Sequence, residues 1–157
     1  MNVVEIRGLT KNYGEVIGIQ DLNLDIKAGE VVGFLGPNGA GKSTTIRTLL
    51  GLIEATSGSA TFLGQNALTR NPKIRREVGY LPGAPTYYNR YKAIDFLKMF
   101  ADIRGINCDK NIEDFAKRLK LDLSKRIGEL SKGNRQKVAV IQAFMHEPKI
   151  ILLDEPT

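Results

Sequence analysis

A glycine-rich loop at residues 36–44 constrains the fold of this chain more than any other feature. Residues 36–43 fit the pattern G-x-x-x-x-G-K-[ST]. The glycines permit backbone angles that other residues avoid, so successive N–H groups can turn inward around phosphate oxygens. Lys42 can then reach the β- and γ-phosphates of a nucleotide, and the Ser43 hydroxyl can ligate Mg²⁺. The candidate phosphate-binding residues are Gly36, Pro37, Asn38, Gly39, Ala40, Gly41, Lys42, Ser43 and Thr44.

The segments on both sides of this loop support the same interpretation. Residues 30–35 form a nearly continuous apolar run, which is typical of a strand buried on both faces. After the loop, Ile46, Leu49 and Leu50 have helical spacing, and Gly51 is a stop signal. A helix that begins at the loop would add its positive N-terminal end to the phosphate site. Strand, loop and helix in this order predict an α/β fold.

Further strands are expected on both sides of this unit. Residues 3–9 and 16–26 alternate in part between apolar and polar, with Gly14 between them, and predict half-buried antiparallel strands. Residues 59–63 and 78–81 predict two more strands.

Between about residues 82 and 135 the pattern becomes helical. One helix would place Ile94, Leu97 and Ala101 on one face and end at Gly105. A second would have Asp109 as its N-cap. Its apolar face would consist of Ile112, Phe115, Ala116 and Leu119. A third would cover residues 131–146, with Val138, Ile141 and Met145 facing inward. Successive helices without an intervening strand predict a helical lobe inserted into the α/β core.

Two acids follow the last apolar run, residues 150–153. A carboxylate at the carboxyl end of a parallel strand lies where open α/β sheets bind ligands. We expect Asp154 to hold Mg²⁺, mostly through water, because this ion keeps much of its hydration shell. Glu155, which points in another direction, is the candidate general base that polarises the attacking water.

The segment Leu-Ser-Lys-Gly-Asn-Arg-Gln-Lys at residues 130–137 carries a third motif. Ser131 at a helix N-terminus could bind an anion through its hydroxyl and the free N–H donors; the alternative is an ordinary N-cap. The partner of a capping box would be Glu or Gln three residues later, but Asn134 stands there. Gly133 near the start of a helix costs up to about 1 kcal/mol, which favours a role other than helix stability.

The order and spacing of these three motifs resemble those of ABC-transporter ATPases over essentially the whole chain. The resemblance implies a P-loop NTPase core of α/β type with an N-terminal antiparallel β subdomain and an inserted helical subdomain. We expect residues 1–82 and 136–157 to form the nucleotide-binding core and residues 83–135 the helical subdomain. The C-terminal part of the sheet would be missing.

The same resemblance implies function. Mg-ATP would be the ligand, and Tyr13 would stack on adenine. Two such domains would pair head to tail, with Ser131 and Gly133 of one contacting the γ-phosphate held by the other. ATP binding and hydrolysis would move a transmembrane permease subunit, from a position in the cytoplasm on the inner face of the membrane.

The chain departs from the family pattern in two ways. Gly83 stands where most members have a glutamine that contacts magnesium and the attacking water. Tyr-Leu-Pro-Gly at residues 80–83, together with Ser-Lys-Gly-Asn at residues 131–134, is similar to a bacterial exporter branch for drugs, antibiotics or related molecules. Tyr87, Tyr88 and Tyr91 follow this site, where family members touch their membrane subunits; the alternative for each tyrosine is an ordinary exposed aromatic residue in a loop. The second departure is the end at Thr157, directly after the acidic motif.

We interpret that end as the mark of a fragment, which alone would hydrolyse ATP poorly. The family's switch histidine comes later in the pattern, and His146 is expected instead to interact with a helix C-terminus.

Composition limits the alternatives. The net charge of +6 is spread among acids, so a mixed solvated surface is favoured and no nucleic-acid partner is expected. No apolar run approaches the roughly 20 residues of a membrane span, the N-terminus does not resemble a signal peptide, and the single Cys108 cannot form an internal disulfide.

The main alternative function is a soluble ABC ATPase acting on the ribosome or nucleic acid. A module that binds ATP without hydrolysing it is a third, against which Glu155 argues.

Overall fold

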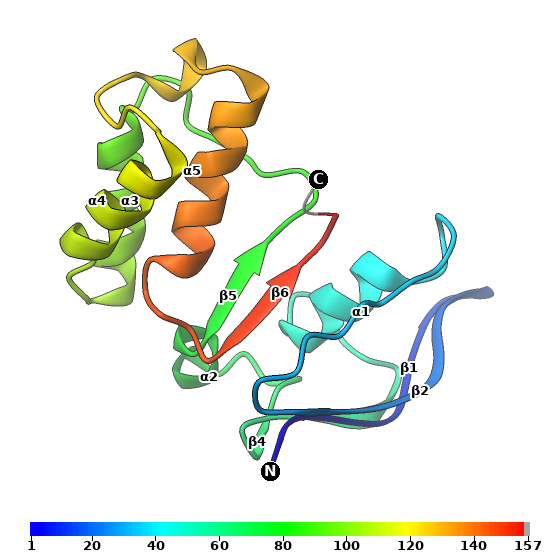
Figure 1. Ribbon diagram of the computed structural model, residues 1–157. Helices are drawn as coiled ribbons and strands as arrows, with labels where there is room; N and C mark the ends of the chain where they lie inside the picture. The colour runs from blue at the N-terminus through cyan, green and yellow to red at the C-terminus, as the bar shows by residue number, and fades with distance from the viewer. Residues whose placement is uncertain (156–157) are drawn as a thin grey trace. The chain divides into compact units, whose positions relative to one another are not determined.

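The computed structural model of the protein describes residues 1–155, so Pro156 and Thr157 at the end of the predicted acidic motif lie outside the described residues. The chain divides into two compact units, Met1–Arg75 and Arg76–Thr157. Each unit is described by itself below, with the element labels of Figure 1.

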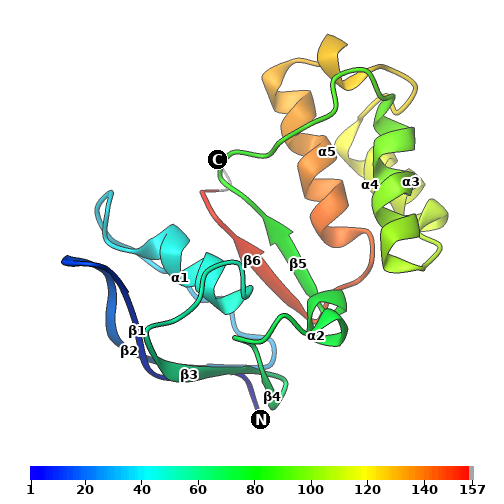
Figure 2. The same ribbon diagram turned by 180° about the vertical axis from the view of Figure 1, so that it is seen from behind.

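The first unit is built on a four-stranded sheet in the order β2-β1-β3-β4. Its strands are β1 (Asn2–Tyr13), β2 (Val16–Lys27), β3 (Ser57–Phe62) and β4 (Gln65–Asn66). All neighbours in this sheet are antiparallel, which confirms the predicted N-terminal antiparallel strands. Figures 1 and 2 show β1 and β2 as one long hairpin, which turns at Gly14 with a φ of 62°. One face of the sheet carries the buried side chains Val4, Ile6, Ala60 and Phe62.

Helix α1 (Lys42–Leu49) follows the glycine-rich loop, as predicted, and ends before Gly51, whose φ is 62°. Thr45, Thr48 and Leu49 are its buried residues. The short helix α2 (Pro72–Arg76) comes at the end of this part of the chain.

The prediction for residues 30–35 was wrong: they form no strand. Val31 is 100% exposed and Leu35 93% exposed, so this run is not buried on either face. An apolar run becomes a buried strand only where neighbouring strands accept and donate its backbone hydrogen bonds. Within the described residues, the four-stranded sheet closes its pairing without this segment, and the second sheet holds only β5 and β6.

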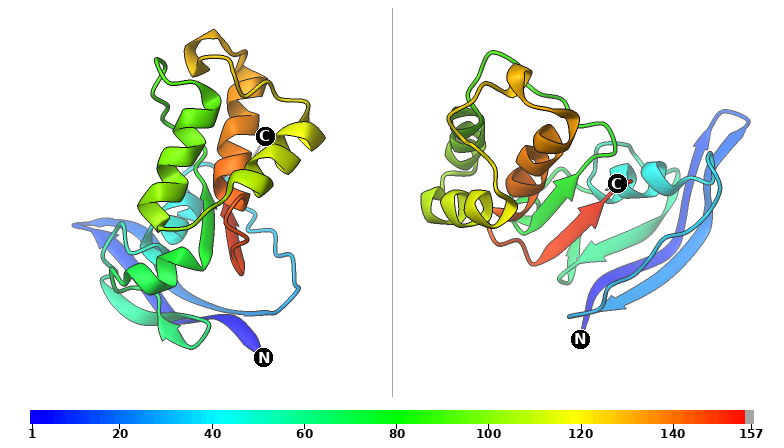
Figure 3. Two further views of the ribbon diagram at one scale, coloured as in Figure 1. Left: turned by 90° about the vertical axis from the view of Figure 1, so that its left-hand side faces the viewer. Right: turned by 45° about the horizontal axis from the view of Figure 1, so that its top comes forward.

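The second unit contains a parallel pair, β5 (Val78–Leu81) and β6 (Ile150–Leu153), in register from Val78–Ile150 to Leu81–Leu153. Helices α3 (Ala93–Arg104), α4 (Asp109–Leu119) and α5 (Lys132–Phe144), with the 3-10 turn η1 (Ile127–Glu129), complete it. Figure 3 shows these helices from two further sides. All three predicted helices and both predicted strands are therefore confirmed.

The helices of this unit enclose an apolar core. Its fully buried members include the predicted inward residues of the third helix, Val138, Ile141 and Met145. Leu97 and Ala101 contribute from α3, and Ile112 from α4. Helix α3 ends at Gly105 in the left-handed conformation, as predicted.

The predicted N-cap of α4 is wrong by one residue. The cap position is Cys108, and Asp109 is the first helical residue. The side-chain oxygen of Asn107 accepts a hydrogen bond from the Asp109 N–H at 2.8 Å, so an asparagine turn before the helix satisfies this donor.

Helix α5 packs against β5 with almost no space between them at Gly79. A Cβ at this position would overlap the carbonyl oxygen of Ala143 and lie 2.8 Å from Cγ of Pro148. Only glycine lets the helix approach the strand this closely. Among residues 1–155, no helix combines the length and the apolar character that crossing a bilayer requires.

Candidate nucleotide-binding site

The glycine-rich loop leads into α1 through two glycines that adopt a left-handed backbone. Gly39 and Gly41 both have a φ of 84°, and Gly41 is the N-cap of α1. Between them, the N–H of Ala40 donates to the carbonyl of Pro37 at 3.2 Å. These angles strain a residue that has a Cβ, so the glycines at these positions allow the loop to curve directly before the helix.

The Lys42 side chain folds back over this loop. Its Nζ donates to the carbonyl oxygens of Gly36 at 2.7 Å and Pro37 at 2.8 Å. An ammonium group has three donors and no acceptor, so one proton remains for another acceptor. The cation is thus held beside the loop backbone, where an anion bound in the curve would meet it.

Gly18 of β2 connects the loop with Tyr13. A side chain at Gly41 would overlap the Gly18 carbonyl, and a Cβ at Gly18 would lie 2.9 Å from Cε2 of Tyr13. Tyr13 is 47% exposed, and Nζ of Lys11 lies 5.0 Å from the centroid of its ring. The first unit therefore brings the predicted adenine-stacking ring and the loop to the same stretch of β2. Sequence reasoning missed Gly18, because a glycine in a strand gives no signal of which segment approaches it.

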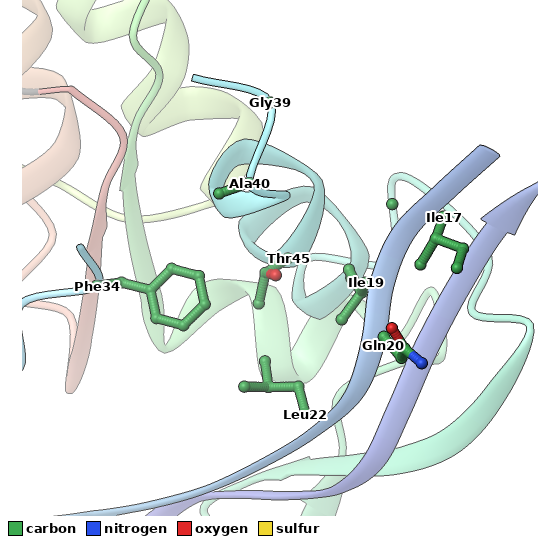
Figure 4. A pocket seen from close by; sticks show the side chains of 9 residues that line it. Ile17, Ile19, Gln20, Leu22, Phe34, Gly39, Ala40 and Thr45 are labelled. Atoms are coloured by element: carbon green, nitrogen blue, oxygen red, sulfur yellow. The ribbon is translucent and has the colours of Figure 1, made fainter. Parts of the chain in front are cut away.

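A cavity of about 270 Å³ lies beside the loop (Figure 4). The Phe34 ring, Leu22 and Ile19 surround Thr45 there, and Gly39 and Ala40 border it. The lining includes neither Lys42 nor Ser43, so this cavity is separate from the predicted phosphate contacts of these two side chains. Phe34 and Leu22 line this cavity, so they do not pack closely against each other. Phe34 belongs to residues 30–35, which form no strand.

In the second unit, the two predicted acids stand at the carboxyl end of β6. The N–H of Asp154 donates to the carbonyl of Leu81 at 2.9 Å, which extends the pairing of β5 and β6 by one bond. Asp154 is only 5% exposed, whereas Glu155 is exposed. Glu155 has a φ of 50°, so the chain turns sharply there and the two carboxylates belong to different environments.

The predicted anion-binding serine is the N-cap of α5. Its Oγ accepts a hydrogen bond from the Asn134 N–H at 3.3 Å, so the capping alternative is realised in this structure. A hydroxyl that accepts from the helix can still donate its own proton to an anion. Ser131, Lys132 and Gly133 are all exposed, and a Cβ at Gly133 would meet nothing within 4 Å. The start of α5 is therefore open to another molecule.

Tyr87 links the loop after β5 with this helix. Its hydroxyl donates to the carbonyl of Arg135 in the first turn of α5 at 2.8 Å. Burial raises the pKa of Tyr87, which favours the protonated phenol that this hydrogen bond requires. Tyr88 and Tyr91 are exposed, and their ring centroids lie 5.8 Å apart. Of the three predicted contact tyrosines, one is a structural link and two face outward.

A cleft of about 410 Å³ opens beside these tyrosines. It is lined by β5, the β5–α3 loop, α3 and α5, and its aromatic members are Tyr80, Tyr87, Phe96 and Phe100. Arg104 is the one charged residue of this lining, and burial lowers the pKa of its guanidinium. Sequence reasoning missed Arg104, because a single arginine in the last turn of a helix is an ordinary stabilising residue.

His146 lies just beyond α5, as predicted, but its interaction differs. Its Nε2 is 3.2 Å from the carbonyl of Val78 in β5. Burial and the nearby Arg104 lower its pKa, so the ring is neutral where a helix C-terminus would favour a charged one. The buried Cys108 also has a raised pKa, caused first by burial.

The predicted site residues thus fall into two sets. The first unit holds Tyr13 and the loop from Gly36 to Thr44. The second holds Ser131, Gly133, Asp154 and Glu155. Within the described residues, no three His, Cys, Asp or Glu side chains gather in a metal-binding group.

Comparison with known proteins adds independent findings. The sequence profile of a family described as "ABC transporter" matches residues 19–157. The bacitracin transport ATP-binding protein BcrA of Bacillus licheniformis is 37% identical over 157 residues, covering 99% of this chain and 51% of that protein. The ABC transporter ATP-binding protein NatA of Bacillus subtilis (strain 168) is 40% identical over 148 residues, covering 90% and 60% respectively. The chain thus spans about half to three-fifths of these relatives.

Solved structures of ATP-binding cassettes have a similar fold. A structure described as the ATP-binding subunit of an ABC transporter superposes with a TM-score of 0.88 at 30% identity, covering 98% of this chain and 66% of that one. The dimeric post-hydrolysis state of an ATP-binding cassette bound to ADP and Pi gives a TM-score of 0.86 at 27% identity, covering 98% and 74%. The fold is therefore that of a P-loop ATP-binding cassette, of mixed α/β type with an antiparallel β subdomain.

Proposed function

Because this chain belongs to the ABC transporter family, we propose that the intact protein hydrolyses Mg-ATP to drive export of a small molecule across a membrane. The observation that carries this proposal is the loop itself: two left-handed glycines, a lysine folded over the backbone and a helix that begins at that lysine. The names of the relatives support a transport role, since one carries bacitracin transport in its name. The alternative role on ribosomes or nucleic acid finds no such support among them.

In this proposal the loop binds the phosphates through its backbone N–H groups and the N-terminus of α1. Lys42 supplies the cation, exchanging its contacts with two loop carbonyls for the more strongly accepting phosphate oxygens. Tyr13 stacks on the adenine ring with its exposed face.

Magnesium would be held by the hydroxyl of Ser43 and the carboxylate of Asp154, with phosphate oxygens and water as further ligands. The donor chemistry fits, because Mg²⁺ is bound through one or two protein oxygens rather than a protein cage. The bound ion would neutralise charge on the transferring phosphate.

Glu155 is the proposed general base. It is exposed at the end of β6, so it can face a water molecule, while the buried Asp154 beside it keeps a separate role. A base at this position would accept a proton from the water that attacks the γ-phosphate.

We assign the open start of α5 to a second ATPase subunit, with Ser131 and Gly133 contacting the γ-phosphate held across the dimer. Residues 83–135 would act as the helical subdomain, and residues 1–82 and 136–157 as the core. In this proposal the chain would lie in the cytoplasm on the inner face of the membrane.

The permease would dock at the aromatic cleft. The rings of Phe96 and Phe100 in its lining suit the apolar face of a short amphipathic segment. Exposed Tyr88 extends this surface, because its ring centroid lies 6.2 Å from that of Phe96 and 5.8 Å from that of exposed Tyr91. Arg104, the one cation of the lining, suits a carboxylate on that segment. The proposed occupant is therefore a cytoplasmic loop of the membrane subunit that carries apolar residues and one acid.

The experiment compares three variants of the intact protein. Lys42→Ala is expected to abolish productive ATP binding, and the control Lys73→Ala, which removes an exposed lysine outside the loop, should bind normally. Glu155→Gln should bind ATP but hydrolyse it slowly, as followed by phosphate release. Near-normal hydrolysis by Lys42→Ala would reject the loop assignment, and an unchanged turnover rate in Glu155→Gln would remove this residue from the base role.

A further inference from the structure

Gly83 stands where most family members have a glutamine, and the structure shows what surrounds it. It follows β5 by two residues, at the end where Leu81 accepts a hydrogen bond from the Asp154 N–H. A Cβ at Gly83 would lie 3.1 Å from the carbonyl oxygen of Asp154 and 3.5 Å from Cβ of Glu155. Its nearest neighbours are thus the two acids themselves.

The 3.1 Å contact is tighter than ordinary van der Waals separation between carbon and oxygen. The atom that would have to yield is a backbone carbonyl, which a side-chain rotation cannot relieve. The peptide between Asp154 and Glu155 would move instead. Because Asp154 is held by Leu81 on the same side, the movement would fall mainly on the turn at Glu155.

That turn is already constrained. Glu155 has a φ of 50°, a left-handed conformation that costs a residue with a Cβ roughly 1 kcal/mol or more. Such a conformation persists only where its surroundings hold it. A bulkier residue at position 83 would change those surroundings directly.

We propose that Gly83 is a positioning residue: by having no side chain it lets the β5–α3 loop approach the Asp154–Glu155 peptide and fixes where the Glu155 carboxylate points. The position is therefore not simply a glutamine lost from the family pattern. This inference rests on the proposed role of Glu155 as general base.

The test measures ATP affinity and single-turnover hydrolysis for Gly83→Ala in the intact protein. ATP affinity should stay within about twofold, because the phosphate loop is untouched. Hydrolysis should slow on the order of tenfold. A misplacement of about 1 Å can lower a rate around 100-fold, and the expected shift of the Asp154–Glu155 peptide is a few tenths of an ångström. Gly83→Gln should slow hydrolysis as well. Faster hydrolysis in Gly83→Gln would show that the position merely lacks its glutamine and would overturn the proposal.

Gly128→Ala is the matched control. A Cβ at Gly128 would lie 3.1 Å from the carbonyl oxygen of Asn89, the same distance to the same kind of atom, but among different residues. Gly128→Ala should destabilise the protein about as much as Gly83→Ala does, but its rate of hydrolysis should not fall. An equal loss in both variants would reduce the Gly83 effect to general destabilisation and overturn the proposal.

A double variant separates this inference from the function on which it rests. In a Glu155→Gln background, Gly83→Ala should leave the residual rate of hydrolysis nearly unchanged, because the carboxylate through which Gly83 acts is gone. If Glu155→Gln is slow but the two effects multiply, Gly83 does not act through Glu155 and the inference fails. If Glu155→Gln is not slow, the proposed base itself is wrong.

Discussion

The hydrogen bond from Tyr87 to Arg135 allows a sharp test of how the second unit is held together. Tyr87→Phe removes one oxygen and leaves the ring in place against Phe96, whose centroid lies 6.1 Å away. The bond is 2.8 Å long and half-buried, which places its net contribution at about 1 kcal/mol. A larger loss is not expected, because a carbonyl in the first turn of a helix keeps its own helical donor. The folded-to-unfolded ratio should fall about fivefold.

The assay is urea-induced unfolding of the intact protein, with the change in midpoint converted to free energy at constant slope. Tyr88→Phe is the matched control: its ring is 58% exposed, and its change should stay within about 0.5 kcal/mol. Equal effects of the two variants would show that the bond contributes nothing. A loss above about 3 kcal/mol would show that Tyr87 supports more than this bond.

Two further predictions concern the same unit. Ile141→Ala should destabilise the intact protein by about 2–5 kcal/mol in urea unfolding, because Ile141 is fully buried in the helical core; a loss below about 1 kcal/mol would contradict that packing. His146 should make stability fall as the pH drops below about 6.5. Its pKa is lowered in the folded state by burial and Arg104, against the weaker opposing effects of Val78 and Glu77, so the unfolded chain binds more protons there. In His146→Gln, which keeps a donor for the Val78 carbonyl, the slope of unfolding free energy between pH 5 and 7 should flatten; an unchanged slope would refute this.

Most elements of this fold follow from local sequence. The strands around Gly14, the helix after the loop, the helix ending at Gly105 and the apolar face of α5 each have a short-range signal, and each is confirmed. Helix periodicity and glycine stops act over a few residues, so one sequence suffices to find them.

The predictions that failed concern features that depend on contacts with other residues of the chain. Residues 30–35 have the composition of a buried strand, but a strand exists only in a sheet, and the described residues pair it with nothing. The N-cap prediction for α4 failed on a smaller scale, because Asn107 accepts a hydrogen bond from the Asp109 N–H and Asp109 is the first residue of the helix. Gly18, Gly79 and Arg104 gave no signal, since their importance lies in what approaches them across the fold.

At the start of α5, Gly133 destabilises the helix, and no contact among the described residues explains why a glycine stands there. Gly133 weakens a helix by about 0.5–1 kcal/mol relative to alanine. Packing within the described residues does not require this glycine, because a Cβ there would meet nothing within 4 Å. Gly79 is the contrasting case, since neighbouring atoms exclude any side chain. A glycine that its own surroundings do not demand, beside an exposed serine with a proton to donate, is explained by close approach of another molecule. The proposed contact of this helix start with a second subunit would account for such a glycine.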